Sequence, residues 1–184
     1  AEQSFLPTTM GNCCYTNHDV DRLINLNDTQ YPLEGTIFHS LQTAMERSME
    51  ISPSAKLPLI LTSVCTKLRE LGGLDTPCIF RVDVEPHILK QQKEKLLQND
   101  YSHNYSDPHI AACLLKDWIK NLKEALIPHP FYDRAIQMVK EQQLYPQTVQ
   151  QFIAELPILH RESISYLIKF LKELTAEEHV QHNK

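Results

Sequence analysis

Histidine and cysteine are the residues of this chain whose types could support nucleophilic catalysis or bind a metal ion. The sequence of 184 residues holds nine histidines and five cysteines, the latter at positions 13, 14, 65, 78 and 113. Their spacing matches neither a zinc-binding pattern nor a disulfide framework, and the sequence has no H-E-x-x-H, G-x-S-x-G or glycine-rich phosphate loop. We therefore predict no metal site and no nucleophilic active site, and a reducing, cytoplasmic compartment.

Basic residues are the more informative candidates. Arg81 follows an Ile-Phe dipeptide in a segment that begins at Gly72-Gly73, and Lys116 and Lys120 stand four residues apart in a helix-like stretch. Residues at this spacing share one face of a helix, and here that face lies away from the apolar residues. Taken singly, each of these residues is typical of an ordinary solvated surface charge.

The composition limits the classes of partner. The chain is 42% hydrophobic and 22% charged, with a formal net charge of −5, which is typical of a single globular domain and disfavours a nucleic-acid partner. The longest apolar run, residues 57–65, contains a proline and is far shorter than the roughly 20 residues that a membrane helix requires.

Proline positions and hydrophobic periodicity predict the elements that must hold these residues. Prolines stand at the head of several stretches whose apolar residues recur every three or four positions, and Asp107 is a natural N-cap. The expected helices cover residues 36–49, 59–71, 86–97, 108–122, 130–142, 146–156 and 158–174. We predict an all-α, single-domain helical bundle over residues 36–184, preceded by an irregular extension over residues 1–35.

One short segment departs from the helical pattern. Residues 79–84 alternate in polarity, and local propensity alone predicts a strand there. No second strand is expected to pair with it, so the segment calls for another explanation.

Four separated motifs follow one another along the chain: LRELGGLDTPCIFRV, HILKQQKEKL, DPHIAACLLKDWIKNLKEALIPHPFY and ELPILHRESISYLIKFLKEL. In this order they resemble the GTPase-activating domain of Rho-family GTPases, the RhoGAP domain. The resemblance covers Thr36 to Leu174. It implies a helical bundle of the RhoGAP type, truncated here before the last helices of that domain, and a role in accelerating GTP hydrolysis by a Rho-, Rac- or Cdc42-type GTPase in its GTP-bound state.

The resemblance also implies roles for the basic residues. Arg81 corresponds to the arginine finger that the family inserts into the GTPase active site, and residues 79–84 would then form the finger loop. Lys116 and Lys120 correspond to basic residues that contact the GTPase and steady this loop. No cofactor is implied, because the GTPase supplies the nucleotide and Mg²⁺.

Departures from the family pattern leave alternatives open. Cys78 stands where the family usually has glycine, and Val82-Asp83-Val84 replaces the small residues that usually follow the finger. A second hypothesis is therefore a RhoGAP-fold module that binds a small GTPase or another protein without catalysis. A third is an unrelated helical scaffold or enzyme.

The amino-terminal segment carries a separate signal. Met10-Gly11-Asn12-Cys13-Cys14 resembles an acylated amino terminus, with Gly11 for myristate and Cys13 and Cys14 for palmitate. We expect membrane contact only if Met10 is the native start, and otherwise an internal Met-Gly pair.

Overall fold

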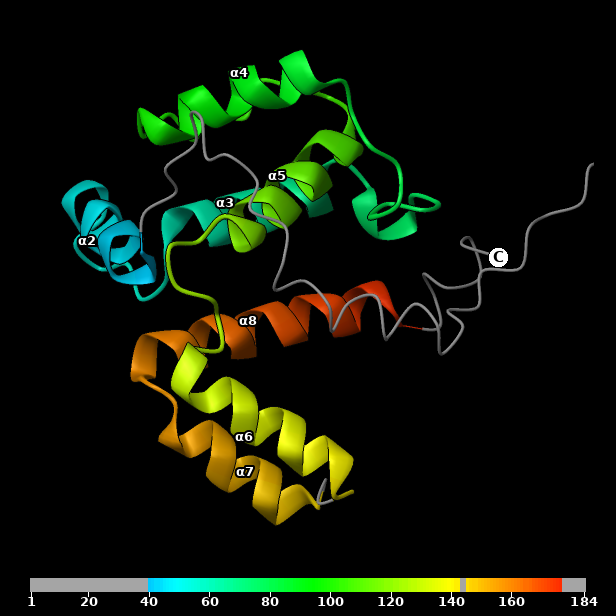
Figure 1. Ribbon diagram of the computed structural model, residues 1–184. Helices are drawn as coiled ribbons and strands as arrows, with labels where there is room; N and C mark the ends of the chain where they lie inside the picture. Colours follow the sequence, from blue (N-terminus) through cyan, green and yellow to red (C-terminus); the bar gives the residue numbers. More distant parts are fainter. Residues whose placement is uncertain (1–39, 143–144, 177–184) are drawn as a thin grey trace, which may run out of the picture. The chain divides into compact units, whose positions relative to one another are not determined.

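The computed structural model describes residues 40–142 and 145–176, all of which belong to one compact unit of the chain, residues 36–184 (Figure 1). Within the described residues the structure contains seven α-helices, one short 3₁₀-helix and no strand, so the predicted all-α fold is confirmed. The elements are α2 (Leu41–Ile51), α3 (Leu59–Glu70), η2 (Gly73–Asp75), α4 (Pro86–Leu97), α5 (Pro108–Lys120), α6 (His129–Lys140), α7 (Pro146–Glu155) and α8 (Ile158–Leu174).

Helix starts follow the local chemistry of the sequence. Asp107 caps α5 as predicted, because its Oδ1 accepts a hydrogen bond of 2.9 Å from the backbone N–H of His109. Ser40 caps α2 in the same way, with its Oγ accepting from the N–H of Thr43 at 3.1 Å. The sequence placed the start of this first helix at residue 36, and residues 36–39 lie outside the described part of the chain.

The central core forms where α5 packs along α3 and α4 (Figure 1). Trp118 and Leu114 of α5 are buried there, together with Leu68 of α3 and Phe170 of α8. Arg69 further joins α3 to α8, because its Nε donates to Glu173 at 2.8 Å and its guanidinium lies 4.9 Å from the ring centroid of Phe170. Helix α5 is thus held on its apolar face by the largest buried cluster of the described residues.

A second, smaller cluster lies between α6 and α7, which run side by side below α8 in Figure 1. Its buried residues are Met138, Phe152 and Leu156, and Ile164 of α8 packs against them. Arg134 of α6 reaches across to pair with Glu155 of α7. This pair of helices therefore has a local core of its own.

Two sequence expectations fall on parts that the structure does not describe. The proposed acylation residues Gly11, Cys13 and Cys14, and the irregular extension over residues 1–35, lie outside the described residues. Within residues 40–142 and 145–176, no helix has both the length and the apolar character to cross a membrane.

Candidate functional site

The segment that carries Arg81 starts from a helix end that requires two glycines. Gly72 follows α3 in the left-handed conformation, with φ of +71°, which glycine adopts without the steric cost that other residues pay. Gly73 has no room for a side chain, because a Cβ there would lie 2.4 Å from Cδ2 of Leu68 and 2.8 Å from its carbonyl oxygen. The chain therefore leaves α3 in a fixed direction and enters η2 directly.

The segment that local propensity predicted as a strand is a turn. The carbonyl of Cys78 accepts hydrogen bonds from the N–H groups of Arg81 at 2.8 Å and Val82 at 3.2 Å. Ile79 is only 4% exposed and joins the central core. As expected, the described residues offer no neighbouring strand for this segment. The turn instead satisfies two backbone N–H groups locally and buries Ile79.

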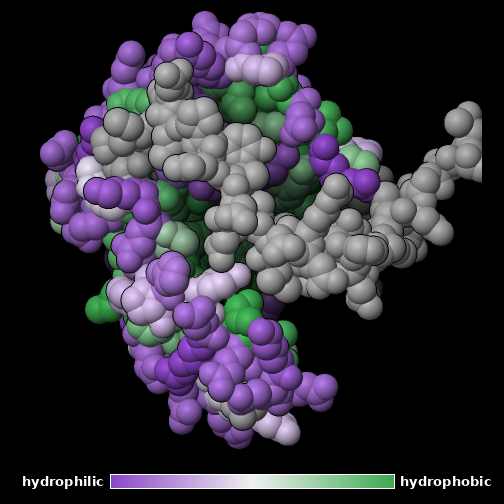
Figure 2. All heavy atoms as spheres, in the orientation of Figure 1, coloured by the Kyte–Doolittle hydropathy of each residue, from purple (hydrophilic) through white to green (hydrophobic). Residues whose placement is uncertain are grey.

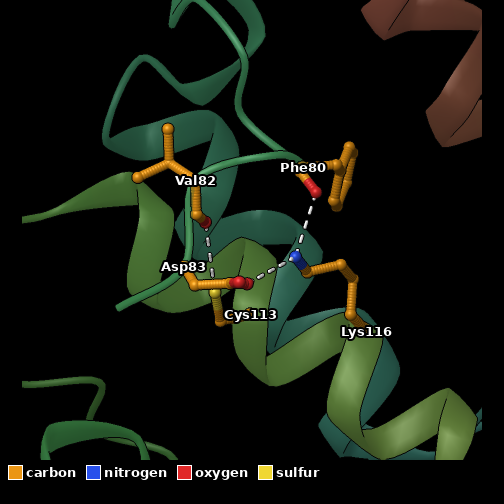
Figure 3. A network of polar contacts seen from close by, with 5 residues as sticks. All are labelled: Phe80, Val82, Asp83, Cys113 and Lys116. Atoms are coloured by element: carbon orange, nitrogen blue, oxygen red, sulfur yellow. Dashed lines mark hydrogen bonds and ion pairs between the residues drawn. The ribbon is translucent and has the colours of Figure 1, made fainter. Parts of the chain in front are cut away.

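Helix α5 holds the backbone on both sides of Arg81 (Figure 3). The Nζ of Lys116 donates to the carbonyl of Phe80 at 2.9 Å, and the Sγ of Cys113 donates to the carbonyl of Val82 at 3.5 Å. Residues 113 and 116 are three apart and therefore neighbours on one helix face. The carbonyls of both sequence neighbours of Arg81 are thus hydrogen-bonded to the same helix.

The side chain of Arg81 is exposed, in contrast to its anchored flanks. Val82 beside it is an exposed apolar residue. Figure 2 shows one face of the molecule, on which hydrophobic and hydrophilic residues are interspersed over the described helices. An exposed arginine on a backbone that is fixed at both neighbours is suited to enter an anionic site on another molecule.

The three residues predicted from the sequence come from two elements that the fold brings together. Lys116 is partly exposed and contacts the loop that carries Arg81, and Lys120 is exposed one turn further along α5. Next to them, Lys93 of α4 pairs with Asp117 at 2.7 Å, which ties α4 to the same helix.

Two contacts of this site were not foreseen from the sequence. Asp83 lies 3.4 Å from the Nζ of Lys116. Cys113 is buried, and its Sγ also reaches the Val82 carbonyl. The three-residue spacing of positions 113 and 116 was the one feature of the sequence that could have suggested these contacts. It shows a common face but does not say which segment that face meets.

Two of the buried histidine and cysteine side chains have environments that disfavour their charged forms. Burial raises the pKa of the Cys65 thiol to about 12, so this thiol stays protonated. Burial lowers the pKa of His103, whose Nδ1 lies 3.1 Å from the hydroxyl of Tyr105. In residues 40–142 and 145–176, no three side chains of His, Cys, Asp or Glu gather in a way that could hold a metal ion.

The fold and this site define a helical domain that presents one arginine on a fixed turn. Residues 58–184 match the family model described as the RhoGAP domain. The chain belongs to the RhoGAP-domain family, and the resemblance inferred from its four motifs is confirmed.

Individual relatives agree with this assignment. The chain is 31% identical over 149 residues to GTPase activating protein homolog 2 of Dictyostelium discoideum, and 28% identical over 158 residues to Rho GTPase-activating protein 40 of Mus musculus. These alignments cover 79% and 83% of this chain but only 16% and 23% of the relatives. The crystal structure of human Rho GTPase activating protein 15 has the same fold, with a TM-score of 0.63 at 18% identity over 79% of this chain and 68% of that one.

Proposed function

We propose that this domain accelerates GTP hydrolysis by a Rho-, Rac- or Cdc42-type small GTPase, and that it does so by inserting Arg81 into the active site of the GTP-bound partner. One observation carries the proposal. Arg81 is exposed on a turn whose neighbouring carbonyls are both bound by α5 and whose Ile79 is buried in the core.

The chemistry of the guanidinium suits this role. Negative charge spreads over the γ-phosphate oxygens and the leaving oxygen as the phosphoryl group is transferred. A guanidinium is always charged and presents a rigid fork of donors, so it can bind several of these oxygens at once, which a lysine cannot do equally well. An arginine supplied in this way accelerates hydrolysis about 10³- to 10⁵-fold in GTPases, which corresponds to about 4–7 kcal/mol of activation free energy.

Fixing the backbone of the finger is part of the proposed mechanism. A catalytic group that is already held near its productive position loses less entropy when the complex forms. Lys116 restrains the loop through the Phe80 carbonyl. In the proposed complex its other N–H donors, which here face Asp83 and solvent, turn to the partner. Lys120, on the next turn of α5, adds positive charge to the same proposed surface.

A second candidate function rests on the conformation of Cys78. This residue adopts a φ of +56°, in the left-handed region that glycine tolerates and other residues adopt at a cost. The resemblance implies glycine at this position. The replacement of glycine by a residue with a side chain, together with Val82-Asp83-Val84 after the finger, supports the second hypothesis, a module that binds a small GTPase without accelerating hydrolysis.

Phosphate release separates the two functions. GTP-loaded Rho-, Rac- and Cdc42-type GTPases are mixed with the full chain, with Arg81→Ala, or with Arg81→Lys. We expect the full chain to accelerate one of them, and both variants to lose at least about 10³-fold of that acceleration while still binding the GTPase. Arg161→Ala, which removes an arginine of α8 that contacts Glu162, is the matched control and should keep full activity.

Each other outcome has a defined meaning. Binding of a GTP-loaded GTPase without acceleration by the unaltered chain would establish the module and contradict catalysis. Acceleration that survives in Arg81→Ala would contradict the role of the finger. The absence of both binding and acceleration across the three GTPase types would contradict both functions.

A further inference from the structure

The ammonium group of Lys116 has two acceptors in the loop, and they differ in kind (Figure 3). Its Nζ donates to the backbone carbonyl of Phe80 at 2.9 Å and lies 3.4 Å from Oδ1 of Asp83. The first contact is at an ideal hydrogen-bond distance, whereas the second exceeds the usual range for a direct bond. The carbonyl contact therefore holds the backbone beside Arg81, and the carboxylate contact adds mainly charge.

The exposure of Asp83 shows that its pair with Lys116 is easily broken. The side chain of Asp83 is 89% exposed, and that of Lys116 is 38% exposed. Ion pairs this exposed add little to the stability of a domain, because water screens the attraction and both side chains lose freedom. We therefore expect the loss of the Asp83 carboxylate to change the stability of the fold little.

The same pair has a larger effect on an incoming anion. The proposed partner presents the phosphates of GTP to the surface that carries Arg81 and Lys116. A lysine whose charge is already offset by a neighbouring carboxylate attracts an anion less than the lysine alone, and the partner must displace that carboxylate to reach it. As docking excludes water, a carboxylate left nearby becomes more costly.

We propose that Asp83 weakens binding of the GTP-bound partner by competing for Lys116. This inference rests on the proposed function, since it assumes that the Arg81 surface faces the nucleotide. Asp83 acts through Lys116 and does not itself contact the reacting atoms. It lowers the affinity of the encounter and leaves the hydrolysis step itself unchanged.

The first test separates binding from chemistry in the stimulated reaction. We expect Asp83→Asn to lower the KM for the GTP-loaded GTPase about two- to fivefold with kcat unchanged. The gain should shrink as ionic strength rises. Glu85→Gln is the matched control, because it removes a carboxylate two residues further along that contacts His87 at 3.2 Å instead of Lys116, and its KM should stay near that of the unaltered chain.

The second test asks whether the effect passes through Lys116. The dissociation constant for the GTPase loaded with a non-hydrolysable GTP analogue is measured for the unaltered chain, Asp83→Asn, Lys116→Met and the double variant. We expect Asp83→Asn to tighten binding in the presence of Lys116 and to have no effect in the Lys116→Met background.

The outcomes distinguish this inference from the proposed function. An unchanged or higher KM in Asp83→Asn, or an equal gain in the Lys116→Met background, overturns the role of Asp83. If Arg81→Ala keeps full acceleration, the proposed function fails in that assay, while the binding series still decides whether Asp83 competes for Lys116.

Discussion

The loop that carries Arg81 and the α6–α7 pair of helices are stabilised in different ways. The loop has few hydrogen bonds of its own, but Ile79 is buried in the central core and α5 binds two of its carbonyls. The α6–α7 pair instead contains its own small cluster around Met138 and Phe152, closed by the pair between Arg134 and Glu155. The difference shows that an irregular segment can be positioned by contacts with the central core and one helix, where a helix pair relies on a cluster of its own.

The largest expected effect comes from two core substitutions, one in the central core that supports the loop and one in the α6–α7 cluster. Leu114→Ala, in the central core on α5, should lower the free energy of unfolding by about 2–5 kcal/mol and also reduce GTPase stimulation, because α5 positions the loop. Met138→Ala should cost about 2 kcal/mol, near the lower end of the same range, and leave stimulation unchanged.

Urea unfolding and phosphate release measure the two quantities on the same proteins. Loss of stimulation in Met138→Ala at a temperature where that variant is fully folded would show that the α6–α7 pair also positions the site, and would contradict the separation of the two regions.

Cys78 offers a smaller and more local change within the loop. Replacing it with glycine relieves the left-handed conformation but adds freedom to the unfolded chain, so we expect Cys78→Gly to raise the free energy of unfolding by at most about 1 kcal/mol. Cys78→Ala keeps the Cβ and removes the thiol, and it should bring no such gain. Equal stabilisation by both variants in urea unfolding would show that the thiol, and not the backbone conformation, is the source of the cost.

The smallest expected effect is a loss of stability of the central region at acid pH. Burial lowers the pKa of His103, which lies in the segment between α4 and α5, below the value of about 6.5 that it has in the unfolded chain. The unfolded state therefore binds the proton more readily, so the contribution of neutral His103 to stability is present above pH 6.5 and is lost as the pH falls below it.

Hydrogen exchange between pH 7 and pH 5, corrected for the intrinsic pH dependence of exchange, should show this loss in α4 and α5 before α6 and α7. His103→Asn tolerates the positive φ of this position and should remove the effect, whereas His129→Gln, at an exposed position of α6, should not. An unchanged response in His103→Asn would assign the acid sensitivity to another group.

Much of the helical architecture could be predicted from the sequence because its causes are local. Proline at helix starts, the Asp107 cap and the spacing of apolar residues in α5 act within a few residues, and each predicted helix appears in the described residues. The family followed from four motifs in order. The same local reasoning failed for residues 79–84, because a strand depends on a partner that local propensity does not include.

The types of the site residues are a property of the sequence, but their roles depend on contacts between distant segments. The resemblance implied that Lys116 steadies the loop, but it did not indicate that the ammonium group binds the carbonyl of Phe80, 36 residues earlier, or that Asp83 lies beside it. Such contacts arise only when burial of Ile79 and packing of α5 on α3 bring the two segments together. The sequence by itself determined the helices, the family and the candidate residues. The tertiary structure decided which carbonyls beside Arg81 are bound by α5 and which carboxylate lies next to Lys116. Burial of apolar surface, and not proximity along the chain, sets those distances.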